Sequence, residues 1–152
     1  MPIHASKTLW FNGKLVPWEQ ANVHVMTHAL HYGSSIFEGI RSYSTPKGAA
    51  IFRLQPHIRR LYDSAKIYRM EIPYTPEDIA EACRSVIRDN ELTDAYIRPL
   101  VWRGYGELGV NPLGSPVEVM VAAMRWGAYL GTEGLEKGVD VQVSSWNRTA
   151  PN

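Results

Sequence analysis

The sequence predicts an α+β fold, in which strands joined by hairpins pack with two neighbouring helices. Three observations support this class: apolar stretches paired across turn residues, two successive stretches with helical periodicity, and no regular alternation of strand and helix. A doubly wound α/β fold would require that alternation. The chain of 152 residues is long enough for one compact domain and the beginning of a second.

Two hairpins are predicted first. Residues 9–16 form one of them, because Asn12-Gly13 accepts the two positive φ angles of a type I′ turn between apolar arms. Residues 36–43 and 50–54 are the arms of the second, with turn residues at 45–48.

Two helices are predicted next. Residues 55–70 carry apolar side chains at steps of three and four, which indicates one buried helical face. That face comprises Ile58, Leu61, Ala65 and Tyr68. The following helix begins after Thr75, a favourable N-cap, with Pro76 at its first position. Its expected core face comprises Ile79, Ala82, Cys83, Val86 and Ile87.

Three more strands complete the prediction. Residues 95–103 are strand-like although they contain Pro99, which favours an edge strand or the end of a hydrogen-bonded ladder. Residues 117–124 are almost continuously apolar and predict a central strand. Valines alternate with polar residues after position 138, which predicts a last strand.

The glycine-rich stretch of residues 126–138 is interpreted as a linker between domains. We therefore expect a small N-terminal domain at 1–125 and the first strand of a second domain at 139–152.

Composition excludes several classes of function. Sixteen basic residues nearly cancel fifteen acidic ones and form no run, so neither a nucleic-acid interface nor a polybasic membrane segment is expected. No stretch reaches the ~20 apolar residues that cross a bilayer, and no secretory leader is evident. Cys83 is the only cysteine, which excludes an internal disulfide and fits a reducing compartment. The cytoplasm is the expected location.

Two motifs suggest sites but lack the context these require. Residues 104–109 match G-x-G-x-x-G, yet Pro112 and Pro116 prevent the helix that a dinucleotide fingerprint needs. His24, His28 and His31 are spaced for one helical face, but no carboxylate completes a metal site. The favoured interpretation is histidines packed and hydrogen-bonded near a pocket wall, and no metal is expected.

Strand periodicity indicates a further site. Tyr96 and Arg98 are two residues apart and share one face of their strand, where Phe37 can lie opposite them. A guanidinium and a phenol beside an aromatic ring suit a small carboxylate. An exposed cross-strand pair without a binding role is the alternative.

Several motifs together resemble the class IV pyridoxal-phosphate aminotransferases, and most closely the bacterial branched-chain members. They are HALHYG (28–33), FEGIR (37–41), residues 54–68, YIRP (96–99), GVNP (109–112), WGAYLG (126–131) and SSWNR (144–148). The resemblance implies the N-terminal half of a two-domain enzyme that forms a homodimer or a higher homo-oligomer. This enzyme would use pyridoxal 5'-phosphate to move an amino group between leucine, isoleucine or valine and 2-oxoglutarate, forming glutamate.

The resemblance also implies roles for individual residues. Arg60 corresponds to the arginine that holds the cofactor phosphate, and Tyr96 to a ligand of the substrate α-carboxylate. Arg98, with Tyr32, corresponds to the group that accepts glutamate's distal carboxylate. The walls of the aliphatic pocket correspond to Tyr32, Phe37, Trp126 and Tyr129. Val110 corresponds to a residue that one subunit contributes across the dimer interface to the site of the other.

The catalytic Schiff-base lysine implied by the resemblance lies beyond Asn152, so no catalytic residue is expected among these 152 residues. The lysines present are in turns, at the chain's start or at polar helical positions, namely Lys7, Lys14, Lys47, Lys66 and Lys137. We therefore expect the 152 residues alone to be inactive. The alternatives are a catalytically silent binding or dimerisation domain, and another class IV enzyme such as a D-amino-acid aminotransferase.

Overall fold

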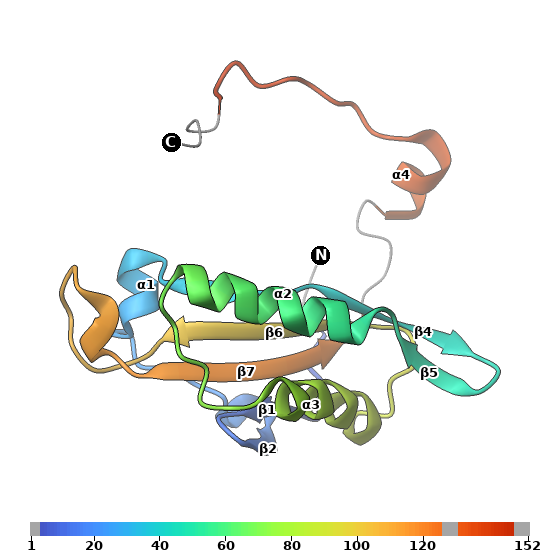
Figure 1. The fold of residues 1–152 in the computed structure, drawn as a ribbon. Helices are drawn as coiled ribbons and strands as arrows, with labels where there is room; N and C mark the ends of the chain where they lie inside the picture. The colour runs from blue at the N-terminus through green and yellow to red at the C-terminus, as the bar shows by residue number, and fades with distance from the viewer. Residues whose placement is uncertain (1–3, 126–130, 148–152) are drawn as a thin grey trace.

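The computed structural model describes residues 4–125 and 131–147. One antiparallel sheet of seven strands organises the chain, in the order β2-β1-β7-β6-β4-β5, with β3 also paired to β6 (Figure 1). The strands are β1 (Thr8–Phe11), β2 (Lys14–Pro17), β3 (Ser35–Phe37), β4 (Ile40–Thr45), β5 (Gly48–Ile51), β6 (Ala95–Arg103) and β7 (Val117–Met124).

Two long helices, α2 (Leu54–Ile67) and α3 (Pro76–Asp89), cover one face of this sheet (Figure 1). Their apolar stripes meet the sheet in a single core, in which Leu61 and Ile79 are fully buried. The remaining helices are short: α1 (His28–Tyr32), α4 (Gly131–Lys137), and the 3-10 turns Trp18–Gln20 and Pro112–Gly114. Among the described helices, none has the length and apolar character needed to span a bilayer.

The elements with local signals form as predicted. Asn12 and Gly13 have φ angles of 44° and 97°, and they close the hairpin of β1 and β2. The hydroxyl of Thr75 accepts a hydrogen bond from the Asp78 backbone at 3.2 Å, while the Asp78 carboxylate accepts from the Thr75 backbone at 2.8 Å. This reciprocal capping box begins α3 at Pro76.

The prediction for α2 is wrong at its end. The helix finishes at Ile67, and Tyr68 is its C-cap, with 54% of its surface exposed. Arg69 then adopts a left-handed conformation with φ of 52°, which turns the chain before Tyr68 could reach the buried face.

Of the two alternatives predicted from Pro99, the edge strand is wrong, because β6 lies in the middle of the sheet, whereas the end of a hydrogen-bonded ladder is confirmed. On one side β6 pairs with β7 from Tyr96 to Arg103. On the other side its partner changes from β4 to β3 around Pro99, and the Glu38 backbone donates to the Pro99 carbonyl at 3.0 Å. Proline is tolerated there because the ladder is interrupted at the position of its missing N–H. The same interruption divides the single strand predicted for residues 36–43.

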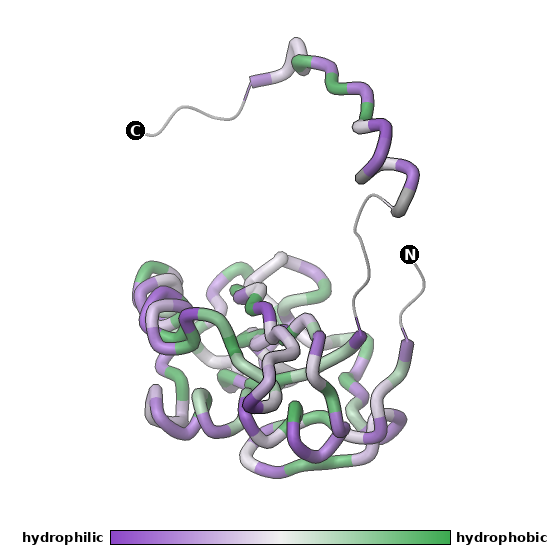
Figure 2. Tube along the Cα trace, turned by 90° about the vertical axis from the view of Figure 1, so that its right-hand side faces the viewer, coloured by the Kyte–Doolittle hydropathy of each residue, from purple (hydrophilic) through white to green (hydrophobic). Residues whose placement is uncertain are grey.

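The last predicted strand does not form in the described residues. Val139, Val141 and Val143 are 52%, 87% and 91% exposed, on an extended segment that leads away from the sheet after α4 (Figure 1). Figure 2 shows apolar and polar stretches alternating along this segment, as the prediction assumed. Alternation alone supplies no ladder partner, and a strand exists only when another strand pairs with it. Residues 131–137 of the predicted linker are helical.

Candidate active site

The sheet face opposite α2 and α3 carries the candidate site. Along β6, Ile97 and Val101 are fully buried in the core beneath the helices. Tyr96 and Arg98 alternate with them and therefore project from the other, open face. The strand register places Phe37 opposite Leu100, on the same open face. The predicted shared face of Tyr96 and Arg98 is confirmed.

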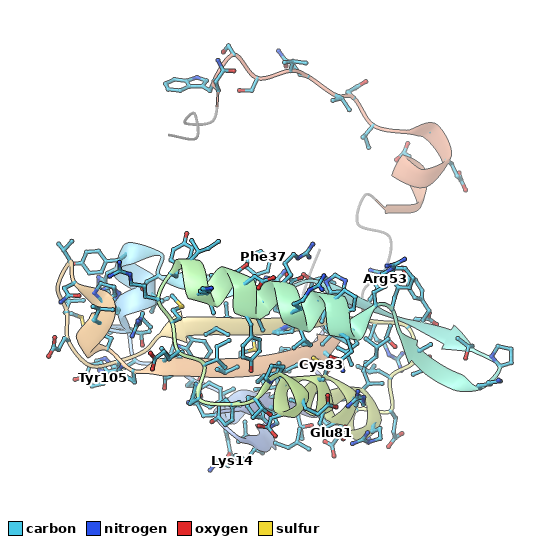
Figure 3. All side chains as sticks on the ribbon, in the orientation of Figure 1. Lys14, Phe37, Arg53, Glu81, Cys83 and Tyr105 are labelled. Carbon is cyan, nitrogen blue, oxygen red and sulfur yellow. The ribbon has the colours of Figure 1, made fainter. Side chains whose placement is uncertain are left out.

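On this face Arg98 contacts two other predicted residues, Tyr96 and Phe37. Arg98 donates from Nε and Nη2 to the Tyr96 hydroxyl oxygen, at 3.0 and 2.7 Å. The Arg98 guanidinium carbon lies 4.1 Å from the centroid of the Phe37 ring, within the range of a cation–π interaction. Phe37 is 57% exposed, at the edge of the sheet beside α2 (Figure 3). A cation, a phenol and an accessible aromatic surface thus meet at one point.

Glu38 connects this cluster to α2. Its carboxylate is only 4% exposed and accepts two hydrogen bonds from Arg60, from Nε to Oε1 at 2.5 Å and from Nη2 to Oε2 at 2.6 Å. His57, one turn earlier on α2, lies with Nδ1 2.9 Å from Oε2. Because a carboxylate only accepts, Nδ1 carries the proton, and its 3.4 Å approach to Arg60 Nη2 is proximity between two donors.

Opposing effects act on the pKa of Glu38. Burial raises it, since a charged group loses hydration, whereas the hydrogen bonds from Arg60 and His57 lower it. The favourable bonds prevail, and the pKa of Glu38 lies below its ordinary value. The carboxylate is therefore ionised at neutral pH and holds Arg60 by charge-assisted bonds.

Gly39 brings the backbone against Tyr96. A methyl group added at Gly39 would lie 2.6 Å from the Tyr96 hydroxyl oxygen, closer than real contacts allow. Three consecutive residues therefore touch three side chains predicted to form the site: Phe37 touches Arg98, Glu38 touches Arg60, and Gly39 touches Tyr96. We call residues 37–39 the junction segment.

Arg60 is suited to bind a phosphate group. Two of its nitrogens are fixed by Glu38, yet the side chain remains 65% exposed. A guanidinium fork matches phosphate oxygens in geometry and charge. The donor chemistry at Arg60 thus fits the phosphate of a cofactor such as pyridoxal 5'-phosphate.

Tyr32 and Val110 belong to a second group. Tyr32 stacks on His28 with ring centroids 4.5 Å apart, and His28 Nε2 is 2.8 Å from the Gly109 carbonyl oxygen, which ties α1 to the loop that carries Val110. Val110 is 86% exposed at this loop. Within the described part of the chain, no hydrogen bond or ring contact links either residue to Arg98. Trp126 and Tyr129 lie outside the described residues.

The three spaced histidines are packed or hydrogen-bonded individually. His28 is 1% exposed, and its Nδ1 lies 2.7 Å from the Ser34 hydroxyl. His31 Nε2 lies 3.0 Å from the Val25 carbonyl oxygen, and His24 packs on Tyr105. No group of three potential metal ligands occurs in residues 4–125 and 131–147. The interpretation of His28 as a packed, hydrogen-bonded residue is confirmed.

A separate apolar cavity of about 450 Å³ hollows the same open face. Leu100 and Trp102 line it from β6, together with Phe11 from β1 and Met120 from β7. Neither Tyr96 nor Arg98 lines this cavity. The apolar hollow and the Arg98 cluster therefore lie side by side along β6.

Sequence reasoning did not identify Glu38, Gly39 and His57 as parts of the site. The available signal was the pair Glu38-Gly39 inside an otherwise strand-like stretch, since a carboxylate and a glycine both disfavour a buried strand. That signal does not name Arg60 as the partner, because the two residues are 22 positions apart.

Comparisons with known proteins agree on one family. The model of the amino-transferase class IV family matches residues 35–152. The branched-chain-amino-acid aminotransferase of Escherichia coli strain K12 is 58% identical over 145 residues, which are 95% of this chain and 47% of that protein.

Solved structures give the same result. The crystal structure of an Escherichia coli branched-chain amino acid aminotransferase superposes with a TM-score of 0.92 at 57% identity, over 97% of this chain and 49% of that one. The T.th. enzyme of the same name, complexed with N-(5'-phosphopyridoxyl)-L-glutamate, has a TM-score of 0.79 at 56% identity, over 82% and 42% of the two chains. The chain thus spans about half the length of the relatives it matches. It belongs to the class IV aminotransferase family.

Proposed function

We propose that this chain forms the N-terminal part of a branched-chain amino-acid aminotransferase that uses pyridoxal 5'-phosphate. The substrates are leucine, isoleucine and valine, with 2-oxoglutarate as the amino acceptor and glutamate as its product. The names of the relatives at 57–58% identity support this assignment. The contact of Arg98 with both Phe37 and Tyr96 is the observation that carries it.

That contact addresses how one site receives two kinds of side chain. An aliphatic substrate side chain packs on the apolar ring of Phe37, with Tyr32, Trp126 and Tyr129 as further walls. A glutamate side chain instead directs its distal carboxylate to Arg98, which avoids burial of an unpaired charge.

The remaining residues are assigned to groups that do not differ between substrates, namely the α-carboxylate and the cofactor. Tyr96 binds the α-carboxylate, and Arg60 binds the phosphate of the cofactor. When bound, the cofactor supplies the electron sink that permits an amino group to be exchanged. Val110, on its exposed loop, reaches the site of a second subunit in a homodimer. Cys83, buried in the core and free, fits a cytoplasmic protein.

We also propose that residues 1–125 are the small domain, 126–138 the connection, and 139–152 the start of a second domain. The lysines of the chain are all exposed, namely Lys7, Lys14, Lys47, Lys66 and Lys137. Lys7 and Lys137 form surface ion pairs with Glu91 and Glu133. A solvated, protonated amine is a poor nucleophile, so these 152 residues do not transaminate alone.

The test is amino transfer by the full-length protein. Purified with pyridoxal 5'-phosphate, it should absorb in the visible range, and the band should shift when L-leucine is added. Turnover with L-leucine and 2-oxoglutarate should exceed that with D-alanine, and the 152-residue chain should show none. A preference for D-alanine would identify a D-amino-acid aminotransferase instead, and activity of the short chain would contradict the proposed absence of the catalytic lysine.

A further inference from the structure

We propose that Glu38 is a positioning residue, which holds the Arg60 guanidinium in the orientation that binds the cofactor phosphate, with His57 as its second support. The inference rests on the proposed function, because it concerns the phosphate site of the same enzyme. It adds a residue that contacts neither substrate nor cofactor.

Glu38 and Arg60 differ in solvent exposure, and this difference indicates which of the two side chains positions the other. Glu38 is 4% exposed, whereas the side chain of Arg60 is 65% exposed. Glu38 lies in the junction segment, between strands β3 and β4, and its backbone N–H is bonded to Pro99. The buried carboxylate is therefore the fixed partner, and the exposed guanidinium is the group that it fixes.

The bidentate geometry restricts Arg60 more than one hydrogen bond would. Bonds from both Nε and Nη2 fix the plane of the guanidinium as well as its position. An exposed arginine without such a partner has rotamer entropy to lose when it binds a ligand. Glu38 removes part of this loss before the phosphate arrives.

His57 keeps the carboxylate in place. Its protonated Nδ1 donates to Oε2, the same oxygen that accepts from Arg60 Nη2. Glu38 therefore receives three hydrogen bonds from two α2 residues, so its rotamer is fixed by the helix that carries Arg60. His57 should contribute less than Glu38, since it acts through the carboxylate alone.

A competing electrostatic effect makes the proposal testable. Glu38 carries a negative charge beside Arg60, and this charge repels a phosphate. If repulsion outweighed positioning, removal of the charge would tighten phosphate binding. Positioning should prevail, because the carboxylate engages the Nε–Nη2 edge of the guanidinium and leaves Nη1 free of this ion pair.

The experiment compares two cofactors in the full-length protein. Glu38→Gln should weaken binding of pyridoxal 5'-phosphate about tenfold, since hydrogen bonds to charged groups are worth that much or more. Binding of pyridoxal, which lacks the phosphate, should not change. In an Arg60→Met background, Glu38→Gln should have no further effect on either cofactor.

Glu81→Gln is the matched control. Glu81 also accepts hydrogen bonds from two arginines, Arg84 at 3.0 Å and Arg88 at 2.5 Å, but it lies on the outer side of α3 (Figure 3). Its replacement should leave both affinities unchanged. If Glu38→Gln does not fold, Glu38→Asp retains the charge, withdraws the carboxylate by one methylene, and should show the same selective loss.

Two results would overturn the inference. Unchanged or tighter phosphate-cofactor binding would show that Glu38 does not position Arg60. An equal loss for pyridoxal and its phosphate would indicate a general structural role. Failure of the proposed function is distinguishable from both, because the wild-type protein would then fail to transaminate leucine, whatever the cofactor affinities of the Glu38 variants.

Discussion

The two faces of the sheet differ in how deeply the side chains of β6 are buried. The face beneath α2 and α3 buries Ile97, Val101, Val119 and Val121 completely. The open face carries Tyr96 and Arg98, which are partly exposed, and Phe37, which is more than half exposed. One strand, β6, supplies both kinds of residue by simple alternation. The completely buried apolar residues are therefore concentrated on one face, and the predicted site residues of β6 lie on the other.

The difference explains why the site can hold charged groups. Arginine and glutamate cannot be buried singly in an apolar core without a large loss of hydration. Arg98 on the open face and Arg60 on α2 both keep access to solvent, while Tyr96 and Glu38 restrict their motion. The helical face in turn fixes the strand that carries Arg98.

The largest expected effect comes from truncating a buried side chain in the core between the helices and the sheet. Leu61→Ala removes a fully buried side chain of α2, and we expect the free energy of unfolding to fall by about 3 kcal/mol. Leu15→Ala, on the exposed hairpin where Leu15 is 40% exposed, should cost less than about 1 kcal/mol. Urea denaturation of the two variants measures the contrast. Equal losses would show that burial by α2 does not dominate stability.

The covered face was the more predictable of the two. Its helices follow from local signals, such as the Thr75-Pro76 start and the three-four spacing of Ile58, Leu61 and Ala65. Long-range pairing was not predictable in the same way. The partner change opposite Pro99 depends on residues 38 and 39, some 60 positions away. No local sequence pattern predicts a pairing between residues so far apart in the chain.

The candidate site likewise combines residues that local periodicity places with residues that only long-range folding brings together. Period-two alternation was sufficient to place Tyr96 and Arg98 on one face, because both lie on one strand. Glu38 and Arg60 lie on a strand connection and a helix, and only the folded chain brings them together. The segment at 139–143 illustrates the converse, since its alternation is visible in the sequence but pairs with no described strand.

A smaller effect should follow from changing the open face at Arg98. Arg98→Met keeps an apolar stem over Phe37 but removes the charge, so kcat/KM for glutamate should fall more than that for leucine. We expect the ratio to change about 10- to 100-fold, because charge-assisted hydrogen bonds contribute roughly 1.5–3 kcal/mol. An equal fall in kcat/KM for both substrates would instead indicate that the Tyr96 hydroxyl has moved after losing its hydrogen bonds from Arg98.

Arg53→Met is the control for that ratio. Arg53 also lies over an aromatic ring, that of Phe52 at 5.7 Å, but Figure 3 shows it apart from Phe37, the ring that Arg98 contacts. Its replacement should leave the ratio unchanged. If Arg98→Met lowered both activities equally, the role of Arg98 would be confined to holding Tyr96, and glutamate's distal carboxylate would bind elsewhere.

The smallest effect should come from Gly39→Ala, which changes a single contact on the open face. The added methyl would lie 2.6 Å from the Tyr96 hydroxyl oxygen and 3.1 Å from a ring carbon, so the phenol must move. The same oxygen accepts both hydrogen bonds from Arg98, and its displacement should lower kcat/KM roughly tenfold for leucine and glutamate alike.

A double-variant comparison separates this contact from a general disturbance of the junction segment. Tyr96→Phe removes the oxygen that the methyl would meet most closely, so adding Gly39→Ala to Tyr96→Phe should cost much less than adding it to the wild type. Steady-state kinetics of the four proteins give the coupling. An equal loss in both backgrounds would mean that Gly39 acts on the backbone of the segment, and that the approach of Gly39 to Tyr96 has no part in placing the hydroxyl.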